Sequence, residues 1–231
     1  MQWAMCGRFT LTSTNEALMQ RFGVALEAGL QPRYNIAPGQ QSVILTARPQ
    51  RQASLARFGI DGPQGKMLIN ARSETIAEKP TFRGAFAARR CLVPASGWFE
   101  WQEKNPQGKH PWYICLTDQR VMGLAGLLFA DQQGGDQFVI VTAAADGHLA
   151  KLHHRTPLVL PASGWSDWLS GPASAASQLL ASPAARYFDA WPVSHAVGKV
   201  ANDHADLIMP AKQEDTDLFA RTSEAGTSEA G

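Results

Sequence analysis

The chain has 231 residues, of which 45% are hydrophobic and 18% are charged, and this composition is typical of a globular protein. It excludes the disordered, collagen-like and disulfide-scaffold classes, and a chain of this length is expected to form one core without disulfide support. The 21 basic and 20 acidic residues leave a formal net charge of +1, so a site for a polyanion requires a local basic patch.

A helix is predicted first, over residues 14–22, because Ser13-Thr14-Asn15-Glu16 has the spacing of a capping box and Gly23 follows the last apolar residue. Strand-like sequence then dominates as far as residue 143. The predicted strands are 42–46, 53–58, 91–93, 98–102, 112–116, 121–128 and 138–143. The turn sequences Asn105-Pro106-Gln107-Gly108 and Gln133-Gly134-Gly135-Asp136 indicate hairpins, so the strands that they join are expected to be antiparallel.

Shorter elements are predicted in the last third of the chain. Asp146 is a candidate cap for a helix through Leu149 and Leu152, and Thr156-Pro157 ends this helix just after His153. Ser174 is a candidate cap for a helix over residues 175–181, and residues 191–194 resemble a returning strand. We therefore predict an α+β fold, with one mainly antiparallel β-sheet or open barrel and peripheral helices.

The three cysteines, Cys6, Cys91 and Cys115, are far apart and form no CxxC pair, which favours a reducing cytoplasm. The longest nearly uncharged apolar run, residues 121–130, is about half as long as a bilayer-spanning helix. No basic region followed by an apolar stretch opens the chain. We expect no secretory signal and no membrane partner.

Metal and cofactor motifs are missing from the sequence. The six histidines and three cysteines show no zinc-ligand spacing, and there is no phosphate loop, no GxGxxG turn and no GxSxG elbow. We therefore expect neither a metal nor a cofactor. Three segments instead place polar groups within or beside apolar sequence: residues 68–72, 97–101 and 152–155.

Glu100 is the most informative of these polar groups. Strand alternation puts Trp98 and Glu100 on one face and Phe99 with Trp101 on the other, so both faces are expected to be buried. Desolvation disfavours a charged carboxylate among tryptophans, which raises its pKa toward values useful for proton transfer. The alternative is a structural ion pair with an arginine.

The other polar residues have ordinary structural interpretations when each is taken alone. His153 fits a histidine at a helix end, and Asn70 fits an amide that supports a turn. Cys91 and Cys115 fit small buried hydrophobic residues. Arg8, Arg72 and Arg155 fit solvated surface charges. No single residue decides the function.

Taken together, seven segments resemble the SOS response-associated peptidase (SRAP) family of abasic-site DNA–protein crosslinking proteins. They follow the order of the family's motifs and extend from Met5 to about Pro210. The segments are Met5-Cys6-Gly7-Arg8-Phe9, Arg33-Tyr34-Asn35-Ile36-Ala37-Pro38, Ile69-Asn70-Ala71-Arg72-Ser73-Glu74-Thr75, Gly97-Trp98-Phe99-Glu100-Trp101, Val141-Thr142-Ala143-Ala144-Ala145, His153-His154-Arg155-Thr156-Pro157 and Pro192-Val193-Ser194.

The resemblance implies one SRAP-like domain over residues 6–212. It implies an extension, residues 1–5, that is removed or not translated, and a disordered polar tail over residues 213–231. Its implied function is to recognise abasic sites in single-stranded DNA and to trap the sugar aldehyde as a thiazolidine on an N-terminal cysteine, with autoproteolytic exposure of that cysteine and lyase activity. The implied location is the cytoplasm, at the nucleoid when DNA is bound, and a monomer is the default.

The resemblance also implies roles for individual residues. Cys6 is the covalent nucleophile, Asn70 holds its amine, Glu100 moves protons, and His153 assists ring opening of the sugar and reversal or strand cleavage. The resemblance implies that Arg8, Arg72 and Arg155 contact DNA phosphates, and that Thr142 and Asn35 line the pocket that receives the substrate.

Three features depart from the family pattern. Cys6 is sixth rather than second, so either Met5 is the translation start, which we favour, or five residues are removed. Residues 58–63 lack the family's tryptophan-glycine pair, which puts an aromatic wedge against DNA bases in doubt. His154 stands where the family commonly has an acidic residue, so the pKa of His153 is expected to be tuned differently.

Two other function classes stay open at this point. Met-Cys-Gly also resembles the start of amidohydrolases with an N-terminal nucleophile, although Glu100 has no role in that mechanism. A non-catalytic β module that binds nucleic acid predicts salt-sensitive association without a covalent product.

Overall fold

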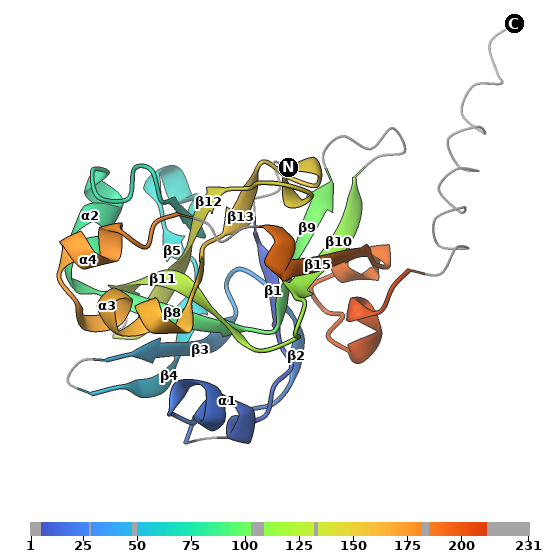
Figure 1. Cartoon of the computed structure of the whole chain (residues 1–231), viewed down its shortest axis with the longest axis horizontal. Coiled ribbons are helices and arrows are strands. Elements are labelled where there is room, and N and C mark those ends of the chain that lie inside the picture. The colour runs from blue at the N-terminus through green and yellow to red at the C-terminus, as the bar shows by residue number, and fades with distance from the viewer. Residues whose placement is uncertain are drawn as a thin grey trace, which may run out of the picture.

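The computed structural model describes residues 6–27, 29–47, 50–102, 109–131, 134–181 and 185–211. Figure 1 shows two β-sheets side by side, with short helices at their periphery. The predicted extension 1–5, the turn at 105–108, Gln133 of the second turn and the tail 213–231 lie outside the described residues.

The first sheet has five strands in the order β15-β10-β9-β1-β2, and every neighbouring pair is antiparallel. Its strands are β1 (Arg8–Leu11), β2 (Arg33–Ile36), β9 (Gly97–Gln102), β10 (His110–Leu116) and β15 (Phe188–Pro192). Since β1 and β9 are neighbours, the segment after Cys6 runs directly beside the strand that carries Glu100.

The second sheet closes on itself. Its strands follow the order β12-β4-β3-β8-β11, and β11 pairs again with β12, so these strands form a closed barrel where an open one was expected. Closure leaves no free edge between them. The barrel strands are β3 (Gln41–Thr46), β4 (Gln52–Phe58), β8 (Arg90–Ala95), β11 (Met122–Ala130) and β12 (Asp136–Ala144). Shorter strands are β7 (Asn70–Arg72), β13 (Arg155–Pro157) and β14 (Val159–Leu160), all attached to the barrel, and β5 (Ile60–Asp61) with β6 (Met67–Leu68), which form a separate ladder.

The strand predictions agree with this architecture. The hairpin pairs β9–β10 and β11–β12 are antiparallel, and the α+β class is confirmed. Two parallel pairings, of β12 with β4 and with β7, were not predicted, because turn sequences reveal only strands that are adjacent in the chain.

Helix α1 (Asn15–Phe22) confirms the first helix prediction. The Thr14 side chain accepts a hydrogen bond from the Ala17 amide, and Gly23 ends the helix at φ 75°, a left-handed conformation that favours glycine. Leu18 and Phe22 are buried one turn apart, and Phe22 stacks on Trp165 with ring centroids 4.5 Å apart.

The remaining helices are short. The α-helices are α2 (Pro80–Ala88), α3 (Trp165–Ser170) and α4 (Ala173–Ser177). The 3-10 helices are η1 (Pro63–Gly65), η2 (Leu149–Lys151), η3 (Ala162–Gly164), η4 (Ala185–Tyr187), η5 (His195–Gly198) and η6 (Ala205–Ile208).

Three predictions in the last third of the chain were wrong in extent. The helix expected after Asp146 is the single 3-10 turn η2, because the chain joins strand β13 soon afterwards. Helix α4 begins directly after Pro172 rather than at a Ser174 cap, and it ends four residues before Ala181. Strand β15 ends at Pro192, two residues before Ser194, and Ser194 caps η5 instead.

Aromatic packing joins the two sheets. Phe9 of β1 lies edge-on to Phe58 of β4 and Phe138 of β12, at centroid distances of 5.5 and 6.5 Å. Gly97 lets β9 approach β10 closely, since a Cβ atom there would lie 2.3 Å from the Tyr113 ring. These contacts fix β1, which begins two residues after Cys6, and β9, which carries Glu100.

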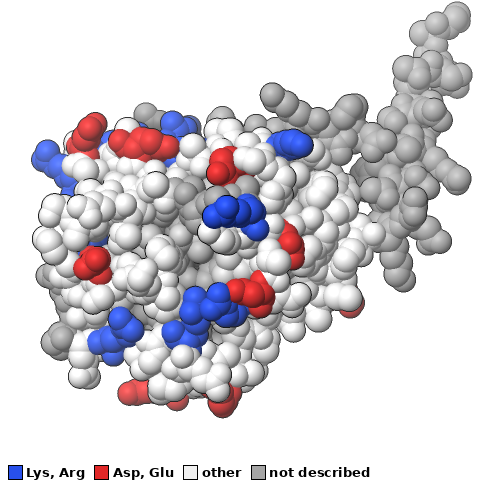
Figure 2. Space-filling view, in the orientation of Figure 1, with Lys and Arg blue, Asp and Glu red and all other residues white. Residues whose placement is uncertain are grey.

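Surface charge is mixed in sign. Figure 2 shows basic and acidic side chains interspersed on the face in view, in keeping with the net charge of +1. Within the described part of the chain, no helix is long and apolar enough to cross a membrane.

Candidate functional site

Cys6 and Glu100 form the centre of the candidate site. Both are buried, with 2% and 4% of their surface exposed, although they are 94 positions apart in the chain. One carboxylate oxygen of Glu100, Oε2, accepts from the Cys6 backbone nitrogen at 3.2 Å and from its thiol Sγ at 3.4 Å. The other oxygen, Oε1, accepts from the Trp101 amide at 3.3 Å. A single carboxylate therefore contacts both groups by which a cysteine can react.

The environment keeps the Cys6 thiol protonated. Burial first, then the negative charge of Glu100 and its hydrogen bond, raise the pKa of this thiol well above its usual value, while the charge of Arg155 lowers it. Cys91 and Cys115 are also buried free thiols, as expected of small hydrophobes. Within the described part of the chain, the Cys6 thiol donates a hydrogen bond to a carboxylate, which can receive its proton.

Cys6 also has an unusual backbone. Its φ angle is 47°, a left-handed conformation that is uncommon for a residue other than glycine. The conformation turns the chain at the start of β1 and aims the Cys6 nitrogen at Glu100. Such strain is frequent at functional sites.

Arg155 lies within the protein, although it was expected to contact phosphate. Its guanidinium is 8% exposed and forms a two-pronged ion pair with Glu74, in which Nη2 and Oε2 are 2.9 Å apart. Nη2 also donates to the Thr142 carbonyl at 2.6 Å and to its hydroxyl at 3.3 Å. Thr142 is fully buried, so it binds Arg155 from the interior of the protein.

His153 is buried beside Arg155. His153 Nδ1 lies 3.1 Å from the Arg155 amide nitrogen and 3.4 Å from the Arg155 carbonyl oxygen, so the backbone of Arg155 fixes the ring. The His154 ring lies 4.3 Å away, tilted by 32°, and His154 is exposed where His153 is not. The structure thus orients one histidine of the pair through the backbone.

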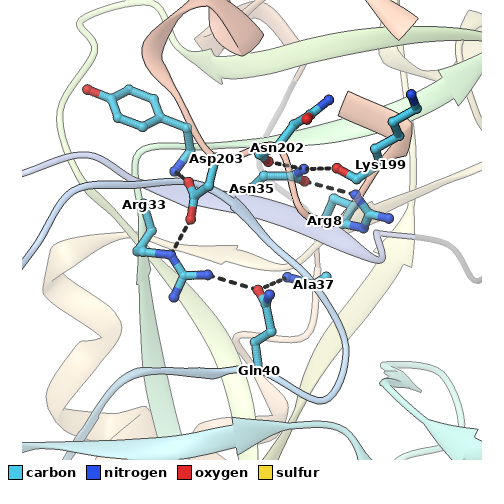
Figure 3. A network of polar contacts seen from close by, with 9 residues as sticks. Arg8, Arg33, Asn35, Ala37, Gln40, Lys199, Asn202 and Asp203 are labelled. Atoms are coloured by element: carbon cyan, nitrogen blue, oxygen red, sulfur yellow. Dashed lines mark hydrogen bonds and ion pairs between the residues drawn. The ribbon is translucent and has the colours of Figure 1, made fainter. Parts of the chain in front are cut away.

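Arg8 and Asn35 bind each other and a segment near the C-terminus (Figure 3). Arg8 Nη1 donates to Asn35 Oδ1 at 2.9 Å and to the Val197 carbonyl at 2.7 Å. The Asn35 amide donates to the carbonyls of Lys199 and Asn202, at 3.1 and 2.7 Å. Both side chains are buried, so these contacts tie β1 and β2 to residues 197–202, and a DNA contact by either residue stays a prediction.

The same segment is held by a second set of contacts. Asp203 accepts from the Tyr34 amide at 2.5 Å and pairs with Arg33, whose Nη2 donates to Gln40 at 2.9 Å. Figure 3 shows these contacts continuing the Arg8–Asn35 network along β2. The sequence analysis missed Asp203 and Asn202, because their partners lie far away in the chain.

Asn70 and Arg72 lie on the short strand β7, beside β12. Asn70 pairs with Ile140 and Arg72 with Thr142 in a parallel register, and the Asn70 amide donates to the Ile140 carbonyl at 3.5 Å. The half-buried Asn70 thus has a long, weak hydrogen bond, while Arg72 is exposed. The register places Arg72 next to the residue that holds Arg155.

The structure brings the predicted site residues together in two groups. Cys6 contacts Glu100, and Arg155 connects Thr142 with His153. Glu74 is the residue missed here: it belongs to the asparagine-containing segment, but its pairing with Arg155 spans 81 positions. Among the described residues, no group of three or more histidines, cysteines and acidic residues could hold a metal ion.

Comparisons with known proteins point to one family. The sequence model of the family described as SOS response associated peptidase (SRAP) matches residues 5–200. The chain is 35% identical to abasic site processing protein YedK of Escherichia coli (strain K12), over 89% of this chain and 100% of that protein. It is 30% identical to abasic site processing protein YoqW of Bacillus subtilis (strain 168), over 88% and 99% of the two chains.

A solved structure has the same fold. A crystal structure of a protein from Bacteroides thetaiotaomicron superposes with a TM-score of 0.77, covering 90% of this chain and all of the other. The two sequences are 22% identical. The α+β architecture therefore persists at low sequence identity.

Proposed function

The chain belongs to the SOS response-associated peptidase family, and from this premise we propose that it processes abasic sites in DNA by forming a covalent thiazolidine through Cys6. The relatives named as abasic site processing proteins match this chain over almost their whole length. The observation that carries the proposal is the double contact of Glu100 with the nitrogen and the sulfur of Cys6. Both atoms take part in the proposed ring.

The reaction needs Cys6 as the first residue of the mature protein. A free α-amine ordinarily titrates at about pH 7.7 to 8.0, so part of it is a neutral nucleophile at physiological pH. The amine attacks the aldehyde carbon of the ring-opened sugar and, with loss of one water, forms a Schiff base. The thiol then adds to the same carbon, its proton passes to the former imine nitrogen, and a five-membered ring closes.

Glu100 is the proposed proton carrier in both steps. It takes the proton that the amine releases on attack and supplies it to the hydroxyl that leaves as water. It then takes the thiol proton, which the raised pKa of the Cys6 thiol would otherwise keep on sulfur, and passes it to the former imine nitrogen. Ring closure is intramolecular, and well-oriented reactions of this kind reach effective molarities of about 10⁵ M or more. An internal cysteine has no free amine and cannot form this ring.

Removal of the residues before Cys6 is part of the proposal. The left-handed φ of Cys6 is imposed only while a peptide bond joins it to Met5, so cleavage or loss of Met5 relieves this conformation. Translation from Met5 with removal of the initiator, or self-cleavage after Met5, gives the same mature amine. That amine is expected to keep the hydrogen bond to Glu100.

The remaining residues take the proposed supporting roles. Arg72 is exposed beside the site and is suited to a phosphate of a single strand, and Asn70 is proposed to turn its amide toward the Cys6 amine. Single-stranded DNA is the proposed substrate, because the aldehyde must reach a buried cysteine. His153 is proposed to move protons when the sugar opens and when the adduct is reversed or the strand is cleaved.

His153→Ala is expected to leave adduct formation nearly intact and to slow release or strand cleavage by about 10²-fold, the usual contribution of a general acid or base. Both rates are measured from one time course on denaturing gels. His154→Ala is the matched control, since its ring touches that of His153 but is exposed. Equal release rates in His153→Ala and the unmodified protein would exclude the role.

The proposed function is tested by incubating protein of known intact mass with single-stranded DNA that contains an abasic site. We expect a protein–DNA band that survives denaturation, and an intact protein mass equal to that of a chain whose first residue is Cys6. Ammonia release from glutamine without a DNA adduct would instead indicate an amidohydrolase. Salt-sensitive binding with neither product would leave a non-catalytic module. A protein that retains residues before Cys6 and still forms the adduct would overturn the thiazolidine.

A further inference from the structure

Glu74 and Arg155 form an ion pair of unequal burial. The arginine side chain is 8% exposed, whereas the glutamate side chain is 49% exposed. Each terminal nitrogen of Arg155 donates to one carboxylate oxygen of Glu74. Glu74 therefore covers a buried cation from the solvent side.

A buried guanidinium requires an anionic partner, because leaving it without one is strongly destabilising. Thr142 offers Arg155 only neutral oxygens. The Nε of Arg155 is buried and has no hydrogen-bond partner within the described part of the chain. Glu74 thus supplies the negative charge, but it leaves one donor of the arginine unused.

Phosphate fits the position of Glu74 well. A phosphate group presents the same two-pronged geometry to arginine as a carboxylate, with further oxygen atoms available. It would meet a guanidinium that Thr142 already holds in place. The half-exposed Glu74 can leave without disturbing the core.

Arg72 is a second cation near Glu74. It is exposed and in register with Thr142, the residue that holds Arg155. Hydrogen bonds from Arg155, and to a smaller extent the charge of Arg72, lower the pKa of Glu74, so its carboxylate is ionised. Glu74 therefore occupies Arg155 as an anion, as a phosphate would.

We infer that Glu74 is a competing anion that occupies Arg155 until a DNA phosphate replaces it. This inference rests on the proposed function. Displacement breaks the Glu74–Arg155 ion pair, so it lowers the affinity of a strand that places a phosphate at Arg155. A strand without a phosphate at this position leaves the pair intact and gains nothing from Arg155.

The test is a double-mutant cycle in the full chain, with single-stranded DNA that carries a tetrahydrofuran abasic analogue. This probe has no aldehyde, so it reports binding without an adduct. Glu74→Gln is expected to lower the dissociation constant about tenfold at fixed salt, and to change it less than twofold in an Arg155→Gln background. Glu78→Gln, an exposed neighbour with the same change of charge, controls for the general field.

The outcomes separate this inference from the proposed function. Equal effects of Glu74→Gln and Glu78→Gln, weaker binding by Glu74→Gln, or a gain that persists in Arg155→Gln would overturn the exchange. A Glu74→Gln protein that fails to fold would show that the pair is structural and would overturn it as well. In each case the unmodified chain would still crosslink true abasic DNA if the proposed function holds.

Discussion

Cys6→Ala is expected to abolish the covalent product with abasic DNA. Produced by translation from Met5, the variant has a free α-amine once the initiator is removed but lacks the sulfur, so it can form at most a reversible Schiff base, which hydrolyses on denaturation. The expected loss is complete in a gel assay without reductant. The fold should persist, because a smaller apolar side chain replaces a buried thiol that packs at the start of β1.

Two controls make the Cys6 result specific. Cys115→Ala removes another buried free thiol and is expected to crosslink normally. Cys6→Ala treated with borohydride should give a trapped amine adduct, which shows that the aldehyde still reaches the site. A heat-stable adduct of Cys6→Ala without borohydride would remove sulfur from the mechanism.

Glu100→Gln is expected to slow adduct formation by about 10²-fold to 10⁴-fold, the range for loss of a general acid or base. Glutamine has the same shape and keeps a hydrogen-bond acceptor near Cys6, but it cannot carry a proton. The measurement is the single-turnover rate of adduct formation on denaturing gels. Glu78→Gln, with the same chemical change at an exposed position, should react at the normal rate.

The same variant has a predicted pH signature. Because the charge of Glu100 and its hydrogen bond raise the pKa of the Cys6 thiol, their removal lowers that pKa, and thiolate forms at lower pH than in the unmodified protein. The slow rate of Glu100→Gln should therefore rise with pH, as thiolate formation replaces proton transfer to the carboxylate. Thiolate absorbance, measured in a Cys91→Ala, Cys115→Ala background, reports the shift. An unchanged or higher pKa would contradict the assigned contact.

Local sequence determined the elements that local forces stabilise. Helix α1 was predicted because its cap, its Gly23 stop and its buried residues all lie within ten positions or so. The β9–β10 and β11–β12 hairpins followed from alternation and turn residues between neighbouring strands. Helix α2 was missed since Lys79 provides no side-chain cap, and Pro80 at the first helical position was the one available signal.

For the candidate site, the residue types could be read from the sequence, but their contacts could not. The family resemblance named Cys6, Glu100, His153 and Arg155, and the burial of Glu100 followed from strand alternation. The contact of Glu100 with both reactive atoms of Cys6, the closed barrel and the Glu74–Arg155 pair required the tertiary structure. These features depend on which distant segments share the low-dielectric interior, where each buried charge must find a partner, and no local pattern encodes that choice.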